Sequence, residues 1–160
     1  MTKRKPLYED LDTLMQEPQE PKLDPEFLDV YACHEHFGMM RHTIPGRLPE
    51  ARWAERVAFL KEEVHELEVA FASQDLVKIF DALLDLVYVA KGTAVMMGLP
   101  WAEGWDAVHR ANMAKVRGIG PRKHRIDLIK PPGWVGPEAE LEALLTSFEA
   151  PGVHEENDDG

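Results

Sequence analysis

Apolar residues recur at helical spacing through the middle of the chain. Between residues 50 and 73 they follow one another at steps of three and four: Trp53, Val57, Leu60, Val64, Leu67 and Phe71. Such a stripe is typical of a helix that buries one face. No segment alternates apolar and polar residues convincingly with the period of two that a half-buried strand requires. The pattern therefore predicts an all-α fold, and it contains no internal repeat.

Local start and stop residues set the bounds of the helices. Asp24 followed by Pro25 is typical of a helix start, with a side-chain cap and then proline in the first turn. Asp75 predicts a second such start, and Gly98 predicts the end of that helix. Together with the stripe, these signals predict helices over about 25–37, 50–73, 75–97 and 102–115, with a short helix over 137–149.

Proline, glycine and acidic residues separate this helical core from both ends. We expect residues 1–24 to be a flexible lead-in with a short helix around residues 8–15, and residues 25–135 to form the main domain. Glycines and prolines between residues 118 and 137 exclude long regular elements there. Residues 136–160 are expected to hold the short helix and a disordered acidic tail.

Charge and composition exclude several classes of protein. The 160 residues include 29 acidic and 18 basic ones, a net charge of −11, which argues against a nucleic-acid-binding surface. A single cysteine, Cys33, excludes an internal disulfide framework. No apolar leader is evident, and the longest apolar segment, 76–97, contains four charged residues. We therefore expect a soluble cytoplasmic protein that does not contact membranes.

The helix expected over 75–97 contains two aspartates that its composition does not explain. It is apolar nearly all round, so we expect it to be buried. Asp81 and Asp85 are four residues apart and share one helix face. Two buried like charges are costly without compensation. Lys or Arg partners, protonation or a metal ion would each provide it.

The preceding helix carries a matching acidic set, namely Glu62, Glu63 and Glu66. If the two helices pack antiparallel through the short connection near residue 74, Glu66 and Asp81 both lie roughly 11 Å from the turn, at 1.5 Å per residue. Four or five carboxylates would then meet, and oxygen ligands of this kind suit Mg²⁺ or Mn²⁺. The alternatives are a solvated glutamate face and aspartates paired with lysine or arginine.

The helix over about 102–115 ends in residues that can bind phosphate. Arg110, Asn112 and Lys115 could reach phosphate oxygens, although a solvated basic last turn is the simpler alternative. Carboxylates that hold divalent ions commonly serve the chemistry of phosphate groups. No glycine-rich phosphate loop and no G-x-S-x-G nucleophile motif is present.

These motifs together resemble a known family. The order EExxE at 62–66, DALLDLVYVAKGTAVMMGLP at 81–100 and VHRANMAKV at 108–116 resembles the MazG-like all-α nucleoside triphosphate pyrophosphohydrolases. The most similar members are phage-type proteins related to the phosphoribosyl-ATP pyrophosphohydrolase domain. The segment DVYACHEHFGMM at 29–40 is similar to the first helix of that family. The resemblance covers about residues 27–135.

The resemblance implies a four-helix core that completes its site as a homodimer or homotetramer. It implies hydrolysis between the α- and β-phosphates with two or three Mg²⁺ or Mn²⁺ ions, in the cytoplasm of a bacterium or of a phage-infected host cell. Many relatives have acids three apart on the third helix, whereas here Ala82 stands at that position and Asp81 one residue before it. The implied sites are Glu62, Glu63, Glu66, Asp81 and Asp85 for metal, with Glu62 and Glu63 catalytic; Lys78, Arg110, Asn112 and Lys115 for phosphate; and His34, Phe37 and Trp53 for the nucleobase.

Several substrates remain open at this stage. A purine nucleotide such as dGTP or GTP is the first choice, and dUTP and phosphoribosyl-ATP are alternatives. The extended segment 116–137 counts against phosphoribosyl-ATP. A non-catalytic helical module that binds metal without turnover is the alternative from another class.

Overall fold

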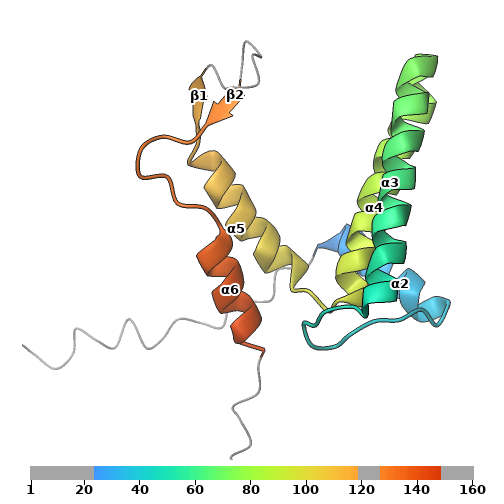
Figure 1. Ribbon diagram of the computed structural model, residues 1–160, viewed down its shortest axis with the longest axis horizontal. Helices are drawn as coiled ribbons and strands as arrows, with labels where there is room; N and C mark the ends of the chain where they lie inside the picture. The colour runs from blue at the N-terminus through green and yellow to red at the C-terminus, as the bar shows by residue number, and fades with distance from the viewer. Residues whose placement is uncertain (1–23, 119–126, 149–160) are drawn as a thin grey trace, which may run out of the picture.

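The computed structural model describes residues 24–118 and 127–148 (Figure 1). The chain is mostly helical, which confirms the all-α class. The four main helices begin and end within two residues of the predicted bounds. The predicted helix around residues 8–15 and the acidic tail lie outside the described residues, and the domain division stays a prediction. The elements are α2 (Pro25–His36), α3 (Glu50–Ser73), α4 (Leu76–Met96), α5 (Trp101–Met113), β1 (Val116–Gly118), β2 (Asp127–Ile129) and α6 (Glu138–Thr146).

The predicted helix starts are formed by side-chain caps. The Asp24 carboxylate accepts a hydrogen bond of 2.9 Å from the backbone N–H of Phe27. Asp75 caps α4 in the same way, accepting from the N–H of Val77 at 3.0 Å. Each cap satisfies an amide that the helix itself leaves without a partner. At the other end of α4, Gly98 has φ +64°, a left-handed conformation that favours glycine.

The core lies where α2, α3 and α4 meet. α3 and α4 form an antiparallel pair joined by a tight turn, and α2 packs against α4. Arg56 of α3 ties the pair together, because its guanidinium donates to Thr93 Oγ1 at 3.1 Å and to the Val89 carbonyl at 2.8 Å. Gly92 allows α2 to approach α4: a Cβ there would lie 3.1 Å from Nε2 of His34. The last eight residues of α4, 89–96, are therefore buried or half-buried.

A buried lysine connects the start of α2 to α4. Lys91 is only 5% exposed, and its Nζ lies 3.0 Å from Asp24 Oδ1 and 2.7 Å from Glu26 Oε2. Burial alone would lower the pKa of Lys91, but the hydrogen bonds to Glu26 and Asp24 outweigh it and raise that pKa. Burial alone would raise the pKa of Asp24, but the Phe27 amide and Lys91 lower it. The pair holds α2 in register with the core.

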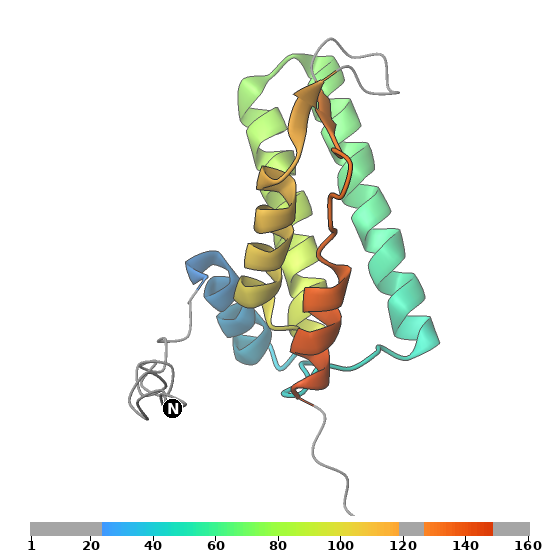
Figure 2. The same cartoon turned by 90° about the vertical axis from the view of Figure 1, so that its left-hand side faces the viewer.

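The remaining elements form a separate arm. α5 leaves the end of α4 and diverges from the α3–α4 pair, so that the ribbon has the outline of a V (Figure 1). α6 packs against α5, and β1 and β2 form an antiparallel ribbon beyond the C-terminal end of α5. Figure 2 shows this ribbon at the opposite end of the molecule from the α2–α3 connection.

The prediction that the third helix is buried is wrong for its N-terminal half. Leu76 is 78% exposed, Val77 77% and Phe80 62%. Within one chain α4 contacts mainly α3 and α2, and these two helices cover only part of its circumference. A helix that is apolar all round indicates how much of its surface must be covered. It does not indicate whether the same chain or another one covers that surface.

The ribbon of β1 and β2 was not predicted. Each strand has three residues, and Val116, Arg117 and Gly118 pair with Ile129, Leu128 and Asp127. Three residues are too few to show an alternating pattern. Gly118 leaves room for the Ile129 side chain, whose end a Cβ at this position would contact. Among the described helices, none combines the length and the apolar content that a membrane crossing requires.

Candidate functional site

The α3–α4 pair brings the predicted acidic residues together. Glu66 of α3 and Asp81 and Asp85 of α4 line one hollow of about 320 Å³. This agrees with the register expected for an antiparallel pair joined near residue 74. Lys78 and Ser73 line the same hollow at its end near the turn. Glu66, Asp81 and Asp85 are all exposed to solvent there, so the hollow is open.

Glu63 is the buried member of the acidic set. It is 7% exposed, whereas Glu62 and Glu66 are exposed. Burial raises the pKa of Glu63, and the negative charges of Glu66, Asp85 and Glu62 raise it further. The charged form is therefore disfavoured until a cation compensates it. Glu63 has the electrostatic character expected of a group at a metal or catalytic site.

The ion-pair alternative for these acids is not what the structure shows. In the described part of the chain, none of Glu62, Glu63, Glu66, Asp81 and Asp85 has a lysine, arginine or histidine nitrogen within 4.0 Å. Other acidic side chains do form such pairs, for example Asp24 with Lys91 and Glu55 with Arg52. These five carboxylates of α3 and α4 therefore have no ion-pair partner among the described residues.

The prediction that four or five carboxylates meet around one point is wrong for the described part of a single chain. Within residues 24–118 and 127–148, no three histidine, cysteine, aspartate or glutamate side chains are placed so that they could hold a metal ion. The arrangement is an open hollow lined by Glu66, Asp81 and Asp85 and not a closed coordination shell; Glu62 and Glu63 do not line it, although Glu63 is close enough to feel the charges of Glu66 and Asp85. The donors of the hollow are carboxylate oxygens that have no ion-pair partner among the described residues, and such oxygens fit a hard divalent ion such as Mg²⁺ or Mn²⁺.

Of the predicted phosphate-binding residues, only Lys78 lies at this hollow. Arg110 of α5 instead pairs with Glu140 of α6. The Lys115 ammonium donates to Asn112 Oδ1 at 2.8 Å, near the C-terminal end of α5. Since α5 diverges from the α3–α4 pair (Figure 1), one chain does not bring these three residues to its own carboxylates.

The three predicted nucleobase residues lie in different environments. His34 is 4% exposed and packed between α2 and α4, with Nδ1 3.2 Å from the Met40 carbonyl oxygen. Phe37 is 70% exposed and Trp53 47%. No hydrogen bond or ring contact among the described side chains joins the three. Their role in base recognition stays a prediction.

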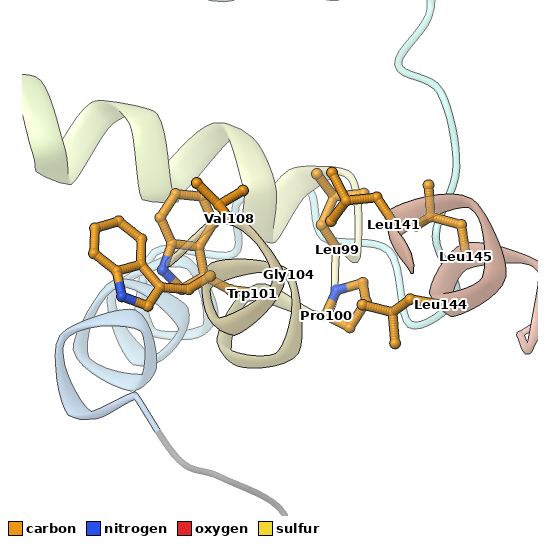
Figure 3. Close-up of a pocket in the computed structure, with 9 residues that line it drawn as sticks. Leu99, Pro100, Trp101, Gly104, Val108, Leu141, Leu144 and Leu145 are labelled. Atoms are coloured by element: carbon orange, nitrogen blue, oxygen red, sulfur yellow. The ribbon is translucent and has the colours of Figure 1, made fainter. Parts of the chain in front are cut away.

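A second pocket, of about 400 Å³, lies between α5 and α6 (Figure 3). Leu141 and Leu144 of α6 approach Leu99 and Pro100 at the start of α5, and Trp101 and Val108 complete the wall. No titratable side chain lines this pocket. It therefore lacks the groups that phosphate hydrolysis requires, and the acidic hollow is the better candidate for chemistry.

Lys130 was not among the functional residues predicted from the sequence. The structure places the Lys130 ammonium 4.3 Å from the centroid of the Trp134 ring, with the Lys115 ammonium 5.6 Å from the same centroid. The run KPPGW at 130–134, with two prolines and a glycine between a cation and an indole, is the signal that could have drawn attention to it.

A helical chain with an acidic hollow of this kind fits a hydrolase that acts on phosphoric anhydrides. The comparison with known families agrees: the phosphoribosyl-ATP pyrophosphohydrolase family matches residues 30–112, just over half of the chain, including all five carboxylates. The chain belongs to this family. The match supports a pyrophosphohydrolase-type activity and confirms the resemblance to the MazG-like pyrophosphohydrolases. No curated protein matches the chain.

Proposed function

We propose that this protein is a metal-dependent pyrophosphohydrolase of nucleoside or deoxynucleoside triphosphates. It would cleave between the α- and β-phosphates and release a nucleoside monophosphate and pyrophosphate. The observation that carries the proposal is the set of five carboxylates of α3 and α4 that have no ion-pair partner among the described residues, with Glu63 the buried one, inside the family match. The family match alone supports only the broader activity.

Each acidic residue has a part in this proposal. Glu63, Glu66 and Asp85 would be the main ligands of two or three Mg²⁺ or Mn²⁺ ions, with Asp81 beside them. The ions would supply charge neutralisation for the triphosphate. Glu62 would orient the attacking water, and a carboxylate beside that water can accept its proton. Lys78, which lines the same hollow, would contact a phosphate oxygen.

The substrate is proposed to be a purine nucleotide such as dGTP or GTP. Phosphoribosyl-ATP is a second candidate, and the description of the matching family favours it. A panel containing the eight common NTPs and dNTPs and phosphoribosyl-ATP separates the two. With Mg²⁺ or Mn²⁺ present, product separation distinguishes pyrophosphate from orthophosphate. Orthophosphate as the only inorganic product would contradict the proposed reaction.

Two variants test the site. Glu63→Gln and Asp85→Asn are expected to lower kcat by at least about 100-fold, the scale of a positioned acid–base group or of lost electrostatic stabilisation. Glu68→Gln is the matched control, because Glu68 lies on the same helix, is exposed and, among the described residues, pairs with His65. Normal turnover by both site variants would show that the site is elsewhere. Metal binding without turnover of any nucleotide would favour the non-catalytic module.

The active form is proposed to contain a second copy of the chain. The exposed apolar side chains of α4, including Leu76, Val77 and Phe80, would be covered by that copy. Asn112 and Lys115 could then serve the carboxylates of the partner chain, since α5 leads them away from their own (Figure 1).

Mixing two impaired variants tests this arrangement. Asp85→Asn and Lys115→Gln, co-refolded in equal amounts and assayed at a substrate concentration below KM, are expected to regain about a quarter of wild-type activity, because half of the dimers are mixed and each has one intact site. A sedimentation measurement gives the assembly state directly. A fully active monomer, or no recovery on mixing, would contradict a shared site.

A further inference from the structure

Two lysines flank the end of the β1–β2 ribbon that lies nearest to α5. Val116 pairs with Ile129, and Lys115 and Lys130 are the next residues outward from this pair, just beyond the two strands. Their ammonium groups carry like charges, which repel each other when they lie close together.

Trp134 holds both lysines in place. Its indole N–H donates to the Ala111 carbonyl at 2.7 Å, which fixes the ring against the C-terminal part of α5. The ammonium groups of Lys130 and Lys115 lie 4.3 Å and 5.6 Å from the ring centroid, within the range of a cation–π interaction. The fold therefore positions both cations beside the Trp134 ring, although the Lys130 side chain is exposed to solvent.

Neither ammonium has an acidic partner among the residues that the structure describes. Within the described residues no carboxylate lies within 4.0 Å of Lys115 or Lys130, although Arg110 nearby pairs with Glu140. The chain has an excess of acidic residues, so the absence of an ion pair here is not a consequence of composition. Two fixed, unneutralised cations beside an amide side chain, Asn112, form a surface complementary to a phosphate group. This region lies beyond residue 112, where the family match ends.

We propose that Lys130, together with Lys115, binds the terminal phosphates of the nucleotide, and that Trp134 is the positioning residue for both. We call these three residues the phosphate clamp. The proposal rests on the proposed function for the identity of the substrate, and it extends that function to the ribbon after α5. In the assembly proposed above, the clamp of one copy serves the carboxylates of the other. Trp134 itself makes no contact with the substrate.

Binding of inorganic tripolyphosphate to the full chain tests the clamp without requiring turnover. Calorimetric titration of Lys130→Gln is expected to show about tenfold weaker binding than the wild type, the loss of one charge-assisted hydrogen bond. Lys130→Arg keeps the charge and is expected to bind within about threefold of the wild type. Arg47→Gln removes an exposed cation from the α2–α3 connection, at the opposite end of the molecule (Figure 2), and is the control. Equal binding by Lys130→Gln and the wild type would overturn the proposal.

The positioning role of Trp134 is tested by steady-state kinetics. Trp134→Leu is expected to raise KM about tenfold while kcat changes less than about threefold, since ground-state phosphate contacts are weakened. Trp134→Phe retains a ring face and is expected to recover part of the KM change, and it serves alone if the leucine variant does not fold. A fall in kcat at constant KM in both variants would contradict a positioning role.

The outcomes separate the clamp from the proposed reaction. Tripolyphosphate binding that depends on Lys130, without turnover of any nucleotide on the panel, would support the clamp and contradict the reaction. Turnover with a KM that Lys130→Gln leaves unchanged would overturn the clamp and leave the reaction standing.

Discussion

The variant Glu63→Gln tests the electrostatic argument most directly. Glu63 is 7% exposed, has no cationic partner in the described part of the chain, and is surrounded by Glu66, Asp85 and Glu62. Because its pKa is raised in the folded state, the native protein binds more protons than the unfolded chain above the unperturbed value of 4.5. The contribution of Glu63 to the free energy of unfolding of the metal-free protein therefore falls as pH rises from 4.5 through the raised pKa. Above the raised pKa this contribution is constant.

Glutamine has nearly the same shape as glutamate and no charge. We expect metal-free Glu63→Gln to be at least as stable as the wild type at pH 7, and to lose this part of the pH dependence. With a divalent ion bound, we expect the wild type to be more stable than Glu63→Gln. An ion that binds only the native state adds about 2.7 kcal/mol at one hundred times its Kd. For a domain of about 100 residues this raises Tm by about 10 °C or more.

The assay is thermal unfolding at pH 7 with and without excess Mg²⁺ or Mn²⁺. The wild type is expected to show the full rise in Tm, and Glu63→Gln only a small fraction of it. Glu68→Gln, which removes an exposed charge from the same helix, is expected to keep the full rise. An equal metal-induced rise in the wild type and Glu63→Gln would refute the assignment of Glu63 as a ligand. A large loss of metal-free stability in Glu63→Gln would refute the inference that repulsion between Glu63 and its acidic neighbours destabilises the wild type.

Two further predictions concern the scaffold of the site. Lys91→Met is expected to destabilise the fold by about 2 kcal/mol at pH 7, measured by urea unfolding, since it removes buried hydrogen bonds to charged groups. Because Asp24 has a lowered pKa, the stability that it contributes is present above pH 3.8 and is lost below it. This loss of stability at low pH should be smaller in Lys91→Met. The same loss in Lys91→Met and the wild type would contradict the pairing of Asp24 with Lys91. Gly98→Ala should lower Tm more than Gly38→Ala: both glycines have positive φ, but only at Gly98 would a Cβ meet a backbone oxygen, that of His42 at 2.7 Å. Equal shifts would show that φ alone decides the effect.

Local signals in the sequence were enough to predict the helices. The caps at Asp24 and Asp75 and the stop at Gly98 act over a few neighbouring residues, so their geometry is legible from the chain itself. The sequence also predicted that Glu66 would lie near Asp81 and Asp85, because a short turn between two long helices leaves few possible registers.

Only the tertiary structure decided which of these side chains is buried and which is paired. Periodicity places Glu62 and Glu63 on one edge of a helix, but the depth of Glu63 depends on how closely α4 packs against α3. The same holds for His34, which the approach of α2 to Gly92 encloses.

The arm that contains α5 shows the limit of sequence reasoning most clearly. Spacing placed Asn112 and Lys115 near the end of a helix, but the direction in which α5 leaves α4 separates them from the carboxylates of the same chain (Figure 1). The contact of Lys130 with Trp134 lies next to a pairing of β1 with β2, and strands of three residues are too short to be predicted from an alternating pattern. Local interactions depend on neighbouring residues and can therefore be predicted from the sequence. Burial, ion pairing and the direction of α5 depend on contacts between segments distant in the chain, which form only when the whole fold is assembled.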